Sequence, residues 1–193
     1  EIGQSIETVL GDVRDKEKLL SVSKKVDIIF HVAALKHVPL CELNPMDAIK
    51  TNILAVQNII SAAQNSNVEE VIYTSTDKAV NPFNVMGTSK LMGEQLIRAA
   101  NIENSGKVFV STRFGNVLGS SGSVVPIFQK QIKRGGPVTL TSSEMTRFVM
   151  SLGEAVNLVL EAGSLAVGGE IFVTKMHTIR IKDLAEIMIA KLA

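Results

Sequence analysis

The chain has 193 residues, of which 46% are hydrophobic and 20% charged, and its formal net charge is +1. This composition supplies enough apolar side chain for a globular core and excludes an intrinsically disordered tail. No basic run is longer than two residues, so we expect no nucleic-acid partner. A single cysteine, Cys41, excludes an internal disulfide, and no apolar stretch reaches the roughly 18 residues of a membrane span. We therefore expect a cytoplasmic protein with no membrane contact by this segment.

Short β-rich apolar runs alternate with longer helical patterns, which is typical of βαβ units and a parallel sheet. In chain order the patterns predict a strand at 7–11, a helix at 15–24, a strand at 26–33, a helix at 45–65, a strand at 69–75, a helix at 84–103, a strand at 107–112, a helix at 124–134, strands at 137–141 and 169–173 around a helix that begins near Ser151, and a helix at 181–191. The middle four strands lack a clean period of two, so we expect both of their faces to be covered. The predicted fold class is α/β with a doubly wound, Rossmann-like parallel sheet.

Two of the predicted helices carry recognisable start signals. Asn44 is a good N-cap residue, Pro45 suits the first helical position, and an apolar stripe follows on one face. Ser151 and Glu154 have the spacing of a capping box. Both helices are therefore predicted from local chemistry as well as from periodicity.

One expected feature of a dinucleotide-binding sheet is missing. Such a sheet opens with a strand, a glycine-rich turn and a helix whose amides hold the pyrophosphate. No G-x-G-x-x-G or G-x-x-G-x-x-G precedes the strand at 7–11, which already ends in Gly11-Asp12-Val13. We expect either that this is not a nucleotide-binding fold or that the fold is truncated at its N-terminus, and also shortly after Met188 at its C-terminus.

The densest group of reactive side chains follows a predicted central strand. Residues 73–78 read Tyr-Thr-Ser-Thr-Asp-Lys, and residues 86–90 read Met-Gly-Thr-Ser-Lys at the start of a helix. Ligands of open α/β sheets bind outside the carboxyl ends of the strands, so this position favours a site. The alternative is a loop ion pair of Asp77 with Lys78 and a solvated helix lysine at Lys90. No cluster of Cys, His and carboxylates has metal-ligand spacing, so we expect no metal.

Eight strings in the chain, taken together, resemble the extended short-chain dehydrogenase/reductase family, and within it the C5-inverting UDP-N-acetylglucosamine 4,6-dehydratases of polysaccharide biosynthesis. They fall in the family's order from residue 7 to about 190. The strings are residues 11–15 (GDVRD), 34–39 (ALKHVP), 44–45 (NP) with 50–52 (KTN), 75–82 (STDKAVNP), 113–117 (RFGNV), 122–126 (GSVVP), 145–148 (MTRF) and 168–173 (GGEIFV).

The resemblance implies a role for each matching residue. Contacts to an NAD or NADP cofactor fall to Asp12, Val13, Ala33, Ala34, Lys36, Asn52, Thr74 and Lys90. Contacts to a UDP-sugar substrate fall to Lys36, His37, Asn116, Ser123, Val124 and Arg147. The catalytic group comprises Thr76, Asp77, Lys78 and Lys90, with Met86 at the position where the family usually has tyrosine. Residues 1–193 would form a partial NAD(P)-binding domain, to whose substrate region 114–148 and 168–193 contribute.

The reaction implied by the resemblance needs a base and an acid. Removal of hydride from C4 makes a ketone that acidifies the C5 proton, a base takes this proton, an acid protonates the departing C6 hydroxyl, and hydride returns to C6. Lys78 would be the base in its uncharged form and Asp77 the acid in its protonated form. Because the thioether of Met86 cannot accept the C4 hydroxyl proton, we expect Thr76 to relay it with Asp77 or Lys78.

Two other functions remain open at this stage. A nucleotide-sugar 4-epimerase or reductase would use the same scaffold, although Asp77 and Lys78 have no task in simple oxidation and reduction at C4. A non-catalytic fragment could retain the fold after losing the tyrosine and the glycine-rich turn. The resemblance further implies a homo-oligomer in the parent protein, assembled through helices at 44–65 and 86–103, and larger members with methionine at this position are anchored to the membrane.

Overall fold

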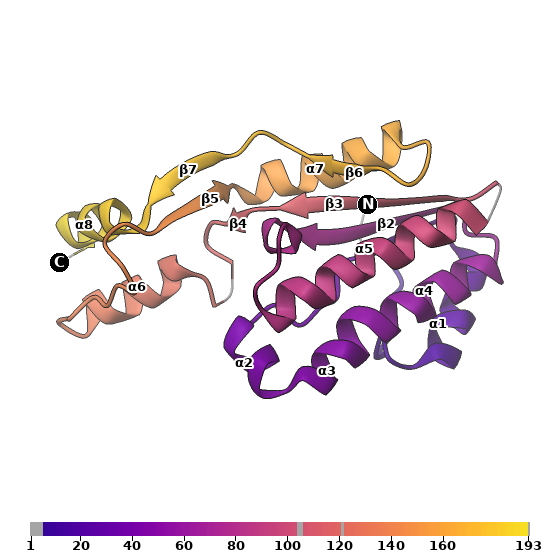
Figure 1. Cartoon of the computed structure of the whole chain (residues 1–193), viewed down its shortest axis with the longest axis horizontal. Helices are drawn as coiled ribbons and strands as arrows, with labels where there is room; N and C mark the ends of the chain where they lie inside the picture. Colours follow the sequence, from indigo (N-terminus) through magenta and orange to yellow (C-terminus); the bar gives the residue numbers. More distant parts are fainter. Residues whose placement is uncertain (1–5, 104–105, 121, 193) are drawn as a thin grey trace.

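The computed structural model describes residues 6–103, 106–120 and 122–192. Its main sheet contains parallel strands in the order β1-β2-β3-β6 (Figure 1). These strands are β1 (Ile28–His31), β2 (Glu70–Thr76), β3 (Val108–Phe114) and β6 (Ile171–Val173). A second, smaller sheet has the order β4-β5-β7 and comprises β4 (Asn116–Val117), β5 (Thr146–Met150) and β7 (His177–Arg180). The parallel, Rossmann-like fold is confirmed.

Helices cover both faces of the main sheet. In Figure 1, α4 and α5 lie on one side of β2 and β3, and α7 lies on the other. The helices are α1 (Lys16–Val22), α2 (Val38–Leu43), α3 (Pro45–Ile49), α4 (Ala55–Gln64), α5 (Val85–Glu103), α6 (Val124–Lys133), α7 (Leu152–Leu165) and α8 (Ile181–Leu192). The sheet is therefore doubly wound, as predicted.

Alternation along β2 divides the core between the two faces. Val71 and Tyr73 are buried with residues of α4 and α5, whereas Ile72 is buried with Ala162 of α7. Successive side chains of a strand point to opposite faces, so each helix layer receives every second residue of the strand. Full burial of a valine or isoleucine contributes roughly 1.5–3 kcal/mol, so these central positions hold β2 firmly between the layers.

A second lobe adjoins the carboxyl end of β3. Here α6 and α8 enclose a separate apolar cluster that contains Phe128, Ile132, Ile181 and Met188. The chain enters the lobe directly from β3 through Gly115 and β4. This connection places the second sheet next to the strand ends of the main sheet.

Several predicted strands differ from the structure. β2 and β3 are covered on both faces. β1 exposes Ile28 and Phe30, so the prediction that both faces of this strand are covered was wrong. Residues 7–11 form no strand, because no strand in the described ranges lies alongside to accept their hydrogen bonds, and Leu10 is exposed. Residues 137–141 form none either, because the Gln131 side chain bonds the backbone N–H and the hydroxyl of Thr139.

The helix predicted at 45–65 contains an unexpected feature. It is divided into α3 and α4 by a π-helical turn (Lys50–Leu54). Asn44 precedes the helix as predicted, but its side chain makes no capping bond and instead donates to the Leu40 carbonyl. The capping box of Ser151 and Glu154 is confirmed. The patterns missed α2, β4, β5 and β7, which are all six residues or shorter.

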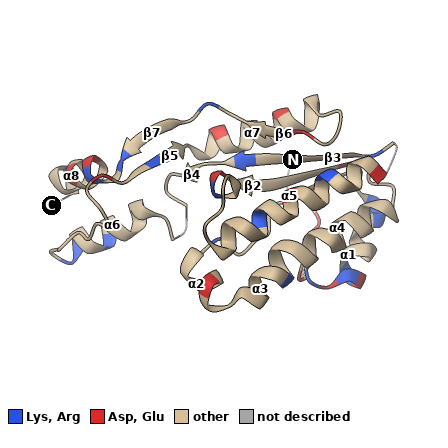
Figure 2. Cartoon of the chain, viewed as in Figure 1, with Lys and Arg blue, Asp and Glu red and all other residues tan. Residues whose placement is uncertain are grey.

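Charged residues are distributed over the whole molecule. Figure 2 shows acidic and basic residues intermixed along the elements in view. Among the described residues, no helix is both long and apolar enough to cross a bilayer.

Candidate active site at the strand ends

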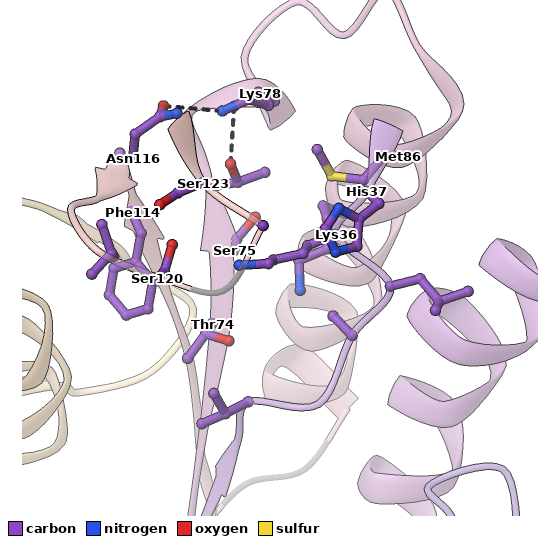
Figure 3. A pocket seen from close by; sticks show the side chains of 18 residues that line it. Lys36, His37, Thr74, Ser75, Lys78, Met86, Phe114, Asn116, Ser120 and Ser123 are labelled. Carbon is purple, nitrogen blue, oxygen red and sulfur yellow. Dashed lines mark hydrogen bonds between the residues drawn. The ribbon is translucent and has the colours of Figure 1, made fainter. Parts of the chain in front are cut away.

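A cavity of 340 Å³ lies at the carboxyl ends of β1, β2 and β3 (Figure 3). The structure brings together on its wall most of the residues predicted for the site: Ala34, Lys36, His37, Thr74, Thr76, Lys78, Met86, Lys90, Asn116 and Ser123. Three further polar or aromatic residues that the motifs did not assign also line it, namely Ser75, Phe114 and Ser120. Ser75 could have been found from the sequence, because it lies inside the predicted reactive string at 73–78.

The group at 76–78 forms one hydrogen-bonded unit. Asp77 begins a short 3₁₀ turn directly after β2, and Thr76 caps that turn by accepting from the Lys78 N–H. Asp77 Oδ1 accepts from Lys78 Nζ and from Thr76 Oγ1, each at 2.9 Å. Lys78 Nζ also donates to Asn116 Oδ1 at 3.4 Å.

This ion pair lies at the cavity and not in bulk solvent. The side chains of Lys78 and Asp77 are 30% and 19% exposed. Lys78 shares the cavity wall with Lys90 from α5 and Asn116 from β4. The amine therefore lies where a ligand in the cavity could exchange a proton with it, whereas Asp77 does not line the cavity and is linked to it through Thr76 and Lys78.

Lys90 is buried, so the alternative of a solvated helix lysine is wrong. It is 5% exposed, and its Nζ lies 4.3 Å from the centroid of the Tyr73 ring. Burial lowers the pKa of Lys90 to about 8, with Glu94 acting in the opposite direction. Glu94 itself is held by a bidentate ion pair with Arg113, with N–O distances of 2.7 and 2.9 Å. The Tyr73 ring and the Glu94–Arg113 ion pair are thus the surroundings of the Lys90 amine.

His31 forms the other side of this buried group. Its ring stacks on Tyr73 with centroids 5.8 Å apart. Burial, and then the nearby charge of Lys90, lowers the pKa of His31 to about 4. The imidazole is therefore neutral at physiological pH and serves as packing beneath the cavity floor.

Asn52 supports the cavity from behind. Its Oδ1 accepts from the Leu35 N–H at 2.8 Å, and its Nδ2 donates to the Leu35 carbonyl and to Ser89 Oγ, each at 2.9 Å. Leu35 lies in the loop between Ala34 and Lys36, both of which line the cavity. The structure thus gives Asn52 a role in holding this loop, and it does not line the cavity itself.

Met86 lines the cavity one helical turn before Lys90. It is buried and packs against Cys41 and Ala48. The residue therefore has an apolar packing environment on one side and the cavity on the other.

The predicted substrate residues are divided between two cavities. Asn116 lines both the first cavity and a neighbouring one of 320 Å³. Val124 and Arg147 line only the second cavity, whereas Ser123, at the start of α6, lines only the first. The two cavities adjoin at Asn116.

Four residues predicted for the cofactor do not line either cavity: Asn52, described above, and Asp12, Val13 and Ala33. Asp12 is exposed and pairs with Arg14 at 2.6 Å, and this partner lowers the pKa of Asp12 to about 2. The Val13 carbonyl accepts from Asn58 Nδ2. A role for these residues stays a prediction.

The first cavity fits the nicotinamide half of a dinucleotide. Its wall contains the buried amine of Lys90 and the small side chains of Ala34 and Ser75. The cavity also lies at the strand ends, where such ligands typically bind. Among the described residues, no three His, Cys, Asp or Glu side chains are grouped as metal ligands. The amine, hydroxyl and amide groups on the wall suit an organic ligand with hydroxyl and amide groups.

Comparison with known proteins identifies the family of the chain. The model of the polysaccharide biosynthesis protein family matches residues 1–193. The chain belongs to this family.

Two curated relatives and one solved structure show the range of that family. The inverting UDP-N-acetylglucosamine 4,6-dehydratase of Campylobacter jejuni is 46% identical over 95% of this chain and 56% of its own length. The UDP-glucose 4-epimerase of Rickettsia massiliae is 48% identical over 92% of this chain and 52% of its own length. The X-ray structure of Pen from Bacillus thuringiensis, 43% identical, superimposes on the whole chain with a TM-score of 0.96 and is covered over 61% of its length. The chain thus spans little more than half the length of these relatives.

Proposed function

We propose that the protein to which this chain belongs is a nucleotide-sugar 4,6-dehydratase, a lyase of surface polysaccharide synthesis that converts UDP-N-acetylglucosamine to a 4-keto-6-deoxy sugar with inversion at C5. The observation that carries the proposal is that Lys78 lies on the cavity wall and is hydrogen-bonded to Asp77 at 2.9 Å. Dehydration needs an acid and a base at adjacent carbons, and this pair supplies both within one short turn.

Each residue of the reactive group has a task in this reaction. NAD or NADP, when bound, would supply the hydride chemistry of the reaction, and the residues of this chain move the protons. Lys78 removes the C5 proton, and Asp77 protonates the departing C6 hydroxyl. Thr76, which donates to Asp77, relays the C4 hydroxyl proton to the Asp77 carboxylate, and this is the proton that Asp77 then gives to the departing C6 hydroxyl. Asn116 orients the Lys78 amine through its side-chain oxygen.

The remaining predicted residues bind the two ligands. Ala34, Lys36, Thr74 and Lys90 would hold the nicotinamide ribose half of the cofactor. Lys36, His37 and Ser123 would contact the sugar diphosphate, and Val124 and Arg147 the uridine diphosphate part in the second cavity. The shared wall residue Asn116 supports one ligand that extends through both cavities.

A labelling experiment in heavy water tests the proposal with the full-length protein. UDP-N-acetylglucosamine and cofactor are incubated with the enzyme, and the product is analysed by mass spectrometry and NMR. A dehydratase places deuterium at C5 of a 6-deoxy product, whereas an epimerase leaves C6 oxygenated. Lys78→Ala should reduce product formation by at least about a hundredfold, which is the scale of general acid–base catalysis.

The epimerase alternative has a relative in its favour, the Rickettsia massiliae enzyme. A C4-inverted sugar that retains its C6 hydroxyl would support it and contradict dehydration. A full-length protein that binds cofactor and substrate but gives no product would instead support a non-catalytic role.

We propose in addition that the full-length protein is cytoplasmic and self-associates through the helices of residues 45–64 and 85–103. The buried free thiol of Cys41 suits a reducing compartment. Leu54 and Met92 are exposed apolar residues on these helices and could be covered in an oligomer. Light scattering of the full-length protein measures its oligomeric state.

A further inference from the structure

Two hydroxyls on the wall of the first cavity have no hydrogen-bond partner among the described residues, those of Ser75 and Ser123, and the one on β2 is that of Ser75. Ser75 is 4% exposed, and within the described part of the chain its Oγ, which exposes less than 1 Å², makes no hydrogen bond. Its neighbours on β2 are engaged, since Thr74 Oγ1 donates to the His31 carbonyl at 3.2 Å and Thr76 Oγ1 donates to Asp77 at 2.9 Å. Ser75 thus differs from the hydroxyls on both sides of it.

A buried hydroxyl without a partner is unfavourable, because it has lost its bonds to water and gained none in return. Ser89, another buried serine near the cavity, shows the usual solution: its Oγ donates to the Met86 carbonyl and accepts from Asn52. The Ser75 hydroxyl on the cavity wall therefore points to a hydrogen-bond partner that belongs to the ligand.

The position of Ser75 indicates which side of the ligand it meets. Ser75 and Tyr73 lie two residues apart on β2 and so share the face that packs against α5. The cavity residues of α5 on this face are Met86 and Lys90. The thioether of Met86 cannot donate a hydrogen bond, so among these three side chains Ser75 and Lys90 are the donors.

We propose that Ser75 Oγ hydrogen-bonds a hydroxyl of the hexose in the nucleotide-sugar substrate. This inference rests on the proposed function. Ser75 immediately precedes the reactive residues 76–78, so the part of the ligand nearest to it is the part that reacts. A sugar hydroxyl both donates and accepts, which matches a serine whose two capacities are both unused. Figure 3 shows Ser75 on the cavity wall between Thr74 and Lys78.

The experiment compares three ligands on the full-length protein by calorimetry. Ser75→Ala should weaken binding of UDP-N-acetylglucosamine roughly three- to tenfold, the loss expected for one neutral hydrogen bond. Binding of UDP, which lacks the hexose, and of NAD⁺ should be unchanged. Ser111→Ala is the matched control, because Ser111 is equally buried on the neighbouring strand and does not line the cavity.

Other outcomes overturn the assignment. An equal loss for UDP and UDP-N-acetylglucosamine would show that the change acts through the nucleotide, and a loss for NAD⁺ alone would assign the hydroxyl to the cofactor. Unchanged binding of all three ligands would remove any role in binding. If the alanine variant does not fold, Ser75→Cys keeps the volume with a weaker donor and should shift affinity in the same direction.

Failure of the proposed function would be seen separately. Wild-type protein that binds UDP-N-acetylglucosamine without forming a 6-deoxy product would contradict dehydration. The comparison of Ser75→Ala with wild type for hexose-bearing and hexose-free ligands would still decide the role of Ser75.

Discussion

Lys90 illustrates how burial changes the chemistry of a single residue. The amine lies over the Tyr73 ring at 4.3 Å, and burial lowers its pKa from 10.5 to about 8. The folded protein therefore binds the Lys90 proton more weakly than the unfolded chain does. Between pH 8 and 10.5 the unfolded chain carries more protons, so the contribution of Lys90 to stability rises with pH across this window.

We predict that the unfolding free energy of the wild type, relative to that of Lys90→Met, rises by about 2 kcal/mol between pH 7 and pH 9.5. The variant lacks the titrating amine and keeps most of the side-chain volume, so the difference between the two proteins isolates Lys90. Urea unfolding at the two pH values measures it. Parallel stability curves would contradict a lowered pKa in the folded protein.

At the scale of elements, the π-helical turn (Lys50–Leu54) places Asn52 against the loop at Leu35. Its amide satisfies both the N–H and the carbonyl of Leu35. This loop carries Ala34 and Lys36 into the cavity. A wall of the site is thus held by one side chain from a helix.

Asn52→Ala should lower the unfolding free energy by about 2–3 kcal/mol, because two backbone groups and Ser89 lose their partner. Hydrogen exchange of residues 33–37 should also become faster. Asn58→Ala is the control, since Asn58 bonds the Val13 and Arg14 carbonyls at a partly exposed site and should cost less than about 1 kcal/mol. Equal losses for the two variants would contradict a special role for Asn52.

The elements predicted from sequence are those whose signals are local. The helix at 85–103 and the strands at 70–76 and 108–114 have long apolar patterns, and the capping box at Ser151 is a property of four residues. The strand predicted at 137–141 failed because Gln131, several residues away on α6, takes its hydrogen bonds. The π turn and the short strand β4 depend on packing and leave no periodic trace.

The site was predicted to a similar extent. The string 75–78 and Lys90 were expected to share a crevice, and the structure brings all of these residues except Asp77 to the cavity wall. Asp77 is bonded to its neighbours Thr76 and Lys78 instead of lining the cavity. Ser75 was not assigned a role, because its missing partner is evident only when the neighbouring hydroxyls are placed in space. The division of Ser123 and Arg147 between two cavities likewise depends on how the second lobe folds.

At the scale of the whole molecule, the first cavity is formed jointly by the main sheet and the second lobe. Lys78 comes from the main sheet and Asn116 from β4 of the second sheet. The described cavity residues suit the nicotinamide half of the cofactor, whereas the 193 residues contain no glycine-rich turn for the pyrophosphate.

We therefore predict that the 193-residue chain binds NAD⁺ or NADP⁺ with at most millimolar affinity. The pyrophosphate contacts that such a turn supplies are missing from these residues, so much of the usual binding energy is missing as well. Isothermal calorimetry with the 193-residue chain, beside the full-length protein as control, measures this affinity. Micromolar binding by the shorter chain would contradict the prediction.

The 2.9 Å contact between Asp77 and Lys78 has one further chemical consequence. A carboxylate beside an ammonium and a carboxylic acid beside a free amine are tautomers, and they differ only in which heavy atom carries the shared hydrogen. Both forms have zero total charge, so the populations of the two tautomers relative to each other do not depend on the acidity of the surrounding solution.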